Sequence, residues 1–227
     1  MRRREFVVLS TNSVAGVLVY SLDWRLTRRS VLTKLPQTLR VPLRFFTQSE
    51  ALAVAAAASR IFPTDESGSG ANEAGVVIYI DRQLAGPWGR DRYRYTEPPF
   101  EQDVGLEFGY QGKATPREIY REGLRRLQAF DELLPAEQDQ KLREIEDTRF
   151  FNLLRRNTIE GMFCDPLHGG NVDMVGWRLI GFPGPQMSWQ ADIDKHFGEA
   201  FRPAPMSLSQ IFPGRKLRGS EDEESKV

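Results

Sequence analysis

Residues 47–63 read T-Q-S-E-A-L-A-V-A-A-A-A-S-R-I-F-P, and this stretch predicts an α-helix with a defined start and end. Thr47 and Glu50 have the spacing of a capping box, in which two side chains satisfy backbone N–H groups at a helix N-terminus. The alanine run favours helix and allows a second helix to approach closely. Pro63 lacks a backbone N–H and ends the helix.

Similar signals recur along the chain. The run from Val76 to Leu84 has helical spacing of its apolar residues, and no second strand-like run exists with which it could pair. Thr115 begins a second capping box with proline at the first helical position. Pro135 opens another helix, and the apolar stripe over 150–162 predicts one more that ends near Cys164. We therefore expect an all-α fold, a small irregular helical domain of about five helices.

Long loops accompany these helices. Residues 87–112 are rich in aromatic and arginine side chains and contain Pro98-Pro99. A loop of this length without its own secondary structure is uncommon in a compact domain and usually contacts something. Two interpretations stay open: a partner-wrapping arm, for which aromatic and arginine residues are suited, and a loop folded on its own domain. Beyond Met187 the periodicity fades.

Composition restricts the classes of function. Among 227 residues, Lys and Arg total 31 and Asp and Glu total 31, so the formal net charge is zero. This balance lacks the basic footprint of a nucleic-acid-binding protein, and we expect no nucleic-acid partner. A single cysteine excludes an intrachain disulfide, a cysteine-based zinc site and a C-x-x-C-H haem attachment. With only two histidines as well, we expect no metal or cofactor in this chain.

The charge is unevenly distributed, because residues 1–46 carry +7 and the remainder −7. The chain starts M-R-R-R-E-F, and a moderately apolar run follows to Leu22. Arg3, Arg4 and Phe6 fit the R-R-x-F form of a twin-arginine export signal. An ordinary basic tail on a buried helix is the alternative. No clean A-x-A site follows Leu22, so cleavage of the segment and its retention as an anchor both stay open.

These patterns divide the chain into four parts. Residues 1–30 form the twin-arginine-type signal or anchor segment, and residues 31–46, with two prolines and no helical period, form a linker. Residues 47–212 form the helical domain. Residues 213–227 form a charged flexible tail.

One stretch is far denser in glycine than the rest. Residues 160–184 read E-G-M-F-C-D-P-L-H-G-G-N-V-D-M-V-G-W-R-L-I-G-F-P-G. Such glycine density indicates tight turns or close backbone approach. Asp165-Pro166 should end the preceding helix, and Asn171 or Asp173 should cap the short helix that follows. Asp165, His168 and Asp173 lie close together in sequence, but no nucleophile, metal-ligand cluster or phosphate loop accompanies them. Hydrogen bonds from their side chains to the backbone of the loops would explain their presence without a catalytic role.

This block resembles the C-terminal signature of the gluconate 2-dehydrogenase subunit 3 family, and residues 45–65 are similar to the first helix of that family. These proteins are the small, or gamma, subunits of membrane-bound FAD-dependent sugar and sugar-acid dehydrogenases. His168 stands where the family more often has Tyr. The resemblance implies a partner interface at the motif residues Cys164, Asp165, Pro166, His168, Gly169, Gly170, Asn171, Asp173, Gly176, Trp177, Gly181, Phe182, Pro183 and Gly184.

The resemblance implies an indirect function. The chain would be a non-catalytic subunit that stabilises a large flavoprotein and supplies its twin-arginine signal to the export machinery. FAD would lie in the flavoprotein, with an iron–sulfur cluster left open, and haem c in a cytochrome c subunit. The complex would be periplasmic and associated with the inner membrane, through the complex or the N-terminal segment. The alternative is a stand-alone envelope protein with its own small-molecule site around Asp165, His168 and Trp177.

The lone cysteine also carries an expectation. An odd cysteine in an exported protein indicates intermolecular pairing or a free thiol, and the periplasm permits disulfides. We therefore expect Cys164 to contact the catalytic partner, and an intersubunit disulfide through its sulfur is one outcome. A buried cysteine that acts as a small hydrophobe is the other outcome.

Overall fold

The computed structural model describes residues 42–94, 97–101, 104 and 109–213, and within these ranges the fold is all-α, as predicted. The five helices of nine or more residues in this part are α2 (Gln48–Ile61), α3 (Val76–Ala85), α4 (Pro116–Leu124), α5 (Pro135–Arg143) and α6 (Arg149–Phe163). Three short helices follow: α7 (Val175–Ile180), α8 (Gln190–Lys195) and α9 (Leu208–Ile211). The predicted export residues Arg3, Arg4 and Phe6, residues 31–41 of the linker and residues 214–227 of the tail lie outside the described residues.

Both predicted capping boxes are present. The backbone N–H of Thr47 donates to Glu50 Oε2 at 2.8 Å, and the N–H of Glu50 donates to Thr47 Oγ1 at 3.3 Å. Thr115 and Glu118 repeat the pair at 2.8 and 3.3 Å. Such an N-cap contributes about 1 kcal/mol to helix stability. These local signals explain why α2 and α4 begin where the sequence predicted.

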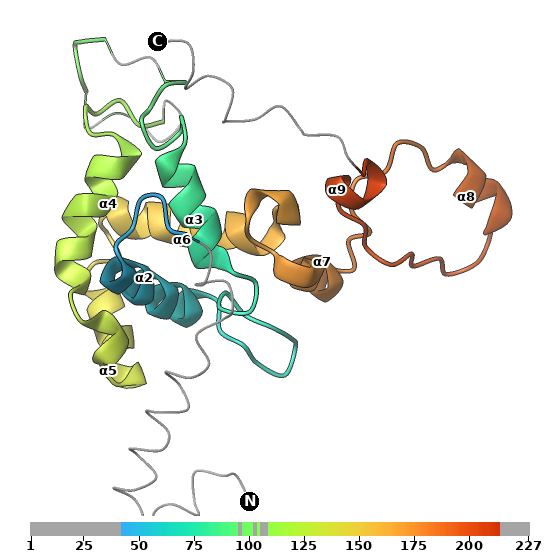
Figure 1. The fold of residues 1–227 in the computed structure, drawn as a ribbon, viewed down its shortest axis with the longest axis horizontal. Helices are drawn as coiled ribbons and strands as arrows, with labels where there is room; N and C mark the ends of the chain where they lie inside the picture. Colours follow the sequence, from blue (N-terminus) through green and yellow to red (C-terminus); the bar gives the residue numbers. More distant parts are fainter. Residues whose placement is uncertain (1–41, 95–96, 102–103, 105–108, 214–227) are drawn as a thin grey trace, which may run out of the picture. The chain divides into compact units, whose positions relative to one another are not determined.

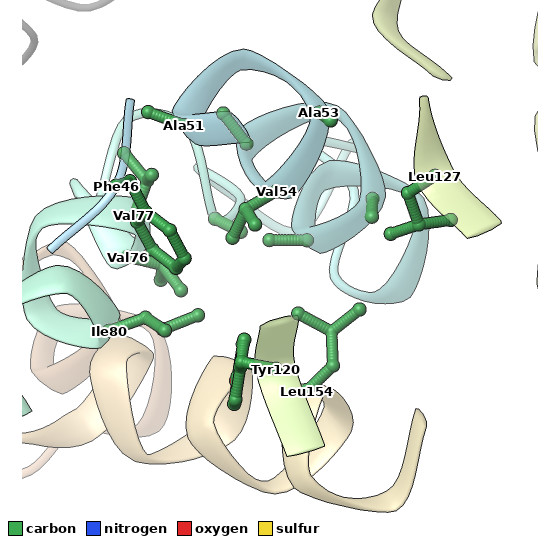
Figure 2. Packing of buried hydrophobic residues seen from close by; sticks show 14 of the residues in the cluster. Phe46, Ala51, Ala53, Val54, Val76, Val77, Ile80, Tyr120, Leu127 and Leu154 are labelled. Atoms are coloured by element: carbon green, nitrogen blue, oxygen red, sulfur yellow. The ribbon is translucent and has the colours of Figure 1, made fainter. Parts of the chain in front are cut away.

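Helix α6 is the centre of the domain, because α2, α3, α4 and α7 all contact it (Figure 1). The shared core lies between these helices, where Val54, Val76, Ile80 and Leu154 converge (Figure 2). Alanines on the inner face of α2, such as Ala51, are fully buried. Their small side chains let the helices pack closely, as the sequence predicted.

A buried carboxylate joins the end of the linker to this core. Asp81, on α3, is 1% exposed, and its carboxylate accepts from the backbone N–H groups of Arg44, Phe45 and Phe46 at 2.8, 3.0 and 2.9 Å. Arg121 donates to the carbonyl oxygen of Phe45 at 2.8 Å. We call residues 44–46 with Asp81 the linker clamp. It holds the chain just before α2 against α3 and α4.

The aromatic loop is described in part, and its two ends pack on the helical domain. Trp88 packs against the core. The guanidinium groups of Arg94 and Arg149 lie over the ring of Tyr110, at 4.9 and 3.7 Å from its centroid. The hydroxyl of Tyr110 accepts from the backbone N–H of Ala114 at 3.1 Å. These contacts support the second interpretation for the two ends of the loop, while residues 97–99 and 101 are exposed and leave both interpretations open there.

Candidate functional site

The glycine-dense block begins where α6 ends. Cys164 is the C-cap of α6, with an extended backbone, and Pro166 opens a short 3₁₀ turn over Pro166–His168. Asp165 uses both carboxylate oxygens within the chain: Oδ1 accepts from Leu167 N–H at 3.0 Å, and Oδ2 accepts from Leu208 N–H at 2.8 Å. The expected helix stop at Asp165-Pro166 is confirmed. The contact with Leu208 also fixes a distant part of the chain.

Asn171 caps the helical stretch that follows it and also holds the end of α6. It is fully buried; its Nδ2 donates to the carbonyl oxygen of Cys164, and its Oδ1 accepts from Gly176 N–H, both at 2.8 Å. Met174 directly precedes α7 and its own side chain makes no capping hydrogen bond, so the first-turn N–H of Gly176 is satisfied by Asn171. Asp173 is exposed with a left-handed φ of 54°. The capping prediction is therefore confirmed for Asn171, which precedes the helical stretch Val172–Ile180 and accepts from its Gly176 N–H, whereas Asp173 lies inside that stretch.

Three other buried motif residues pack on the last turn of α6: Gly170, Gly176 and Trp177. Trp177 donates its indole N–H to the carbonyl oxygen of Phe163 at 2.7 Å. A Cβ on Gly176 would lie 1.9 Å from the carbonyl oxygen of Met162, and one on Gly170 would lie 2.3 Å from that of Gly161. Helix C-termini leave carbonyl groups without intrahelical partners. The motif is thus the structure that caps α6, and its glycines permit the close approach.

Beside this cap lies a groove with a cavity volume of about 470 Å³. Its lining includes Tyr79, Ile159, Glu160, Phe163, Cys164 and His168. A polar network forms one wall, because Glu160 Oε2 accepts from the Tyr79 hydroxyl at 3.2 Å and from Asn157 Nδ2 at 2.9 Å. Burial raises the pKa of Tyr79, and the neighbouring Glu160 charge raises it further. This hydroxyl therefore stays protonated at neutral pH.

Cys164 lines this groove and is half-buried. Its thiol donates to the carbonyl oxygen of Gly161 at 3.6 Å. Burial raises the pKa of the thiol to about 11, so the thiolate is scarce at neutral pH. The intersubunit disulfide at Cys164 stays a prediction.

The residues of the alternative small-molecule site have other partners. Both oxygens of Asp165 and the indole N–H of Trp177 are bonded to backbone groups of the chain itself. His168 is exposed and faces the groove. Within the described ranges, no group of three His, Cys, Asp or Glu side chains could hold a metal ion.

The predicted interface residues fall into three sets by exposure. The exposed ones are His168, Asp173, Gly181 and Phe182; the half-buried ones are Cys164, Asp165, Pro166, Gly169 and Pro183; the buried ones are Gly170, Asn171, Gly176, Trp177 and Gly184. A buried side chain can support an interface only by shaping what lies above it. Only residues of the first two sets are therefore accessible for direct contact with another molecule.

Sequence reasoning missed two features of this region. Asp81 received no role, because nothing local indicates that its carboxylate faces residues 44–46. The helix α8 was missed because the periodicity after Met187 is short. The signal was the spacing of Trp189, Ile193 and Phe197, which are four residues apart.

The sequence model of one family, described as gluconate 2-dehydrogenase subunit 3, matches residues 48–184. This range runs from α2 to the end of the motif and covers more than half of the chain. No match was found among curated proteins or among solved structures. In the part of the chain that the structure describes, no helix combines the length and apolar character needed to cross a membrane.

Proposed function

The chain belongs to the gluconate 2-dehydrogenase subunit 3 family, and from this premise we propose that it is the non-catalytic small subunit of an exported FAD-dependent dehydrogenase. It is a subunit of a gluconate 2-dehydrogenase-like complex. Its proposed task is to bind and stabilise the large flavoprotein that oxidises a sugar or sugar acid. The observation that carries the proposal is the family match over residues 48–184.

The use of the motif's polar groups supports a binding role. The carboxylate of Asp165, the amide of Asn171 and the indole N–H of Trp177 all hold backbone of the same chain. Groups committed in this way stabilise a surface and are not free to act on a substrate. The groove beside Cys164 and His168 is the part of this surface that the motif shapes most directly.

The cofactors and location follow from the same premise. FAD belongs to the flavoprotein, with an iron–sulfur cluster beside it left open, and haem c belongs to a cytochrome c subunit. The complex is periplasmic and inner-membrane associated. The twin-arginine signal at Arg3 and Arg4 takes the folded flavoprotein through the export machinery together with this chain.

The export step can be tested with a matched pair of double variants. Replacement of Arg3 and Arg4 by lysine keeps the charge but removes the twin-arginine pair. Replacement of Arg28 and Arg29 by lysine makes the same chemical change at the second arginine pair. Cells that carry each variant are separated into periplasmic and cytoplasmic fractions, and dye-linked dehydrogenase activity and flavoprotein content are measured in both.

The proposal expects the Arg3→Lys/Arg4→Lys variant to retain both the chain and the flavoprotein in the cytoplasm. The Arg28→Lys/Arg29→Lys control should export them as the wild type does. Periplasmic activity that is equal in all three strains would contradict the export role.

A further inference from the structure

The chain leaves the helical domain after Gly184 and returns at Ser207, and we call residues 185–206 the arm. It carries α8 and runs between α7 and α9 (Figure 1). The family match ends at residue 184, so the arm starts directly after the matched region. The arm therefore adds to the family domain a segment whose role the match does not describe.

The base of the arm is fixed by the motif. Met206 N–H donates to the carbonyl oxygen of Pro183 at 3.1 Å, and Leu208 N–H donates to Asp165 at 2.8 Å. Gly184 is buried with a left-handed φ of 87°, and a Cβ there would lie 2.0 Å from the carbonyl oxygen of Met206. Only glycine fits such a crossing. The two ends of the arm are thus held together, which limits the conformational entropy that the arm loses when it binds.

The arm exposes large apolar side chains at a density unusual for a soluble surface. Phe197 is 87% exposed, Met187 85%, Ile193 60% and Trp189 41%. We call Trp189, Ile193 and Phe197 the apolar stripe: Ile193 lies on α8, Trp189 is the N-cap of α8, and Phe197 lies two residues beyond its end. Helix α8 buries no residue. Isolated exposed hydrophobics are ordinary, whereas several exposed apolar side chains within one short segment indicate an interaction surface.

The arm also has internal order. The ring of His196 stacks on the ring of Phe201, with centroids 4.1 Å apart and planes within 9° of parallel. His196 Nδ1 lies 3.7 Å from Glu199 Oε2. These contacts join the end of α8 to the segment through which the chain returns to the helical domain. The apolar stripe is therefore presented by a folded loop.

The charged residues of the arm indicate which kind of partner it suits. The arm holds three acidic residues, Asp192, Asp194 and Glu199, against two basic ones, Lys195 and Arg202, so its formal net charge is −1. Helices that lie on anionic membranes carry lysine and arginine on their polar face, so a lipid surface is disfavoured. An isologous pairing of two copies would bring the same acidic groups to one interface. A protein groove with an apolar floor and a basic rim suits both the stripe and the charges.

We propose that the arm docks into an apolar groove with a basic rim on the large flavoprotein subunit. Trp189, Ile193 and Phe197 are the anchors of this contact. The inference rests on the proposed function, because the flavoprotein is the partner that a small subunit of this family must bind. The arm lies outside the family match, which ends at residue 184.

The test uses the tagged full chain purified from its own cells, with the co-purifying flavin measured per chain. The Ile193→Ser/Phe197→Ser variant should lose flavin by about thirtyfold or more, the scale expected when an interface anchor is removed. Its thermal unfolding midpoint should equal that of the wild type, because α8 is not part of the core. Leu134→Ser is the control, since Leu134 is 53% exposed at the N-cap of α5, away from the arm in sequence, and this variant should retain flavin.

Each other outcome has a defined meaning. If the wild type and the arm variant co-purify with equal amounts of flavin per chain, the arm does not dock on the flavoprotein, and the proposed function is left intact. A wild-type chain without any flavoprotein would overturn the proposed function itself. If the isolated wild-type chain forms a dimer and the arm variant does not, the stripe binds a second copy and the inference is overturned. If the wild-type chain binds lipid vesicles, and the arm variant loses this binding but retains flavin, the stripe binds a membrane and the inference is likewise overturned.

Discussion

Asn171 connects two segments of backbone that are five and seven residues away from it in sequence. Its amide bonds the carbonyl of Cys164 and the N–H of Gly176, and no part of it is exposed. Removal of such a side chain leaves two buried backbone groups without partners, each costly when desolvated. The residue is therefore a structural bridge at the centre of the motif.

We predict that Asn171→Ala lowers the free energy of unfolding by roughly 2–4 kcal/mol, because both backbone groups lose their partner. Denaturant unfolding monitored by circular dichroism measures the change. Asn152→Ala, at an exposed position on α6, is the control and should change stability by less than about 0.5 kcal/mol. Equal losses in the two variants would show that Asn171 does not act as a bridge.

The thiol of Cys164 should show its raised pKa in its reactivity. Because the thiolate reacts and burial raises the pKa to about 11, the isolated folded chain should be alkylated slowly at pH 7. The alkylation rate should rise about tenfold per pH unit and level off only near pH 11. The same chain in denaturant, with an ordinary thiol pKa of about 8.5, is the control. A plateau near pH 8.5 in the folded chain would contradict the buried setting of the thiol.

The protonation of the Cys164 thiol also makes the free energy of unfolding depend on pH, and stability falls at alkaline pH. Between the unfolded pKa and the folded pKa, the folded chain binds the proton more tightly than the unfolded chain does. Stability is therefore unaffected by this group below about pH 8.5 and falls as the pH rises toward 11. Cys164→Ser should remove this part of the alkaline loss of stability.

At the scale of elements, the linker clamp fixes where the chain enters the helical domain. Asp81 accepts three backbone N–H groups from residues 44–46, and Phe46 packs near Tyr120 with ring centroids 6.2 Å apart. An asparagine at position 81 would place its NH₂ group or its single oxygen against donors that need an anionic acceptor. At least one N–H would then lose its partner.

We therefore predict that Asp81→Asn speeds hydrogen exchange of the amides at residues 44–46 by at least tenfold, since their acceptor is weakened. Mass spectrometry of peptides that cover the clamp measures this rate. Asp147→Asn, at an exposed position, is the control. Unchanged exchange at the clamp in the Asp81 variant would show that the carboxylate is dispensable there.

The elements that sequence reasoning predicted have local signals. Capping boxes at Thr47 and Thr115, and the proline at position 135, mark helix starts through residues only three positions apart or fewer. The missed features depend on distant contacts. Asp165 meets Leu208 across 43 residues, and Asp81 meets Phe46 across 35. No local pattern reports such pairs, and α8 is too short for its periodicity to stand out.

At the scale of the whole molecule, one motif joins three parts of the domain. It caps α6, lines the groove beside Cys164, and holds both ends of the arm. The glycine density and the helix stop at Asp165-Pro166 could be predicted from sequence. The assignment of buried and exposed motif residues could not, because it depends on how the block wraps around α6.

The central claim is that this chain acts by binding a flavoprotein and carries no dehydrogenase activity itself. The most direct measurement is dye-linked oxidation of sugars and sugar acids by this chain alone, by the flavoprotein alone, and by the two expressed together, each normalised to protein and flavin content. The claim predicts no turnover and no flavin for this chain alone, and the greatest yield of active flavoprotein when both are present. Oxidation of a sugar acid by this chain in isolation would contradict it.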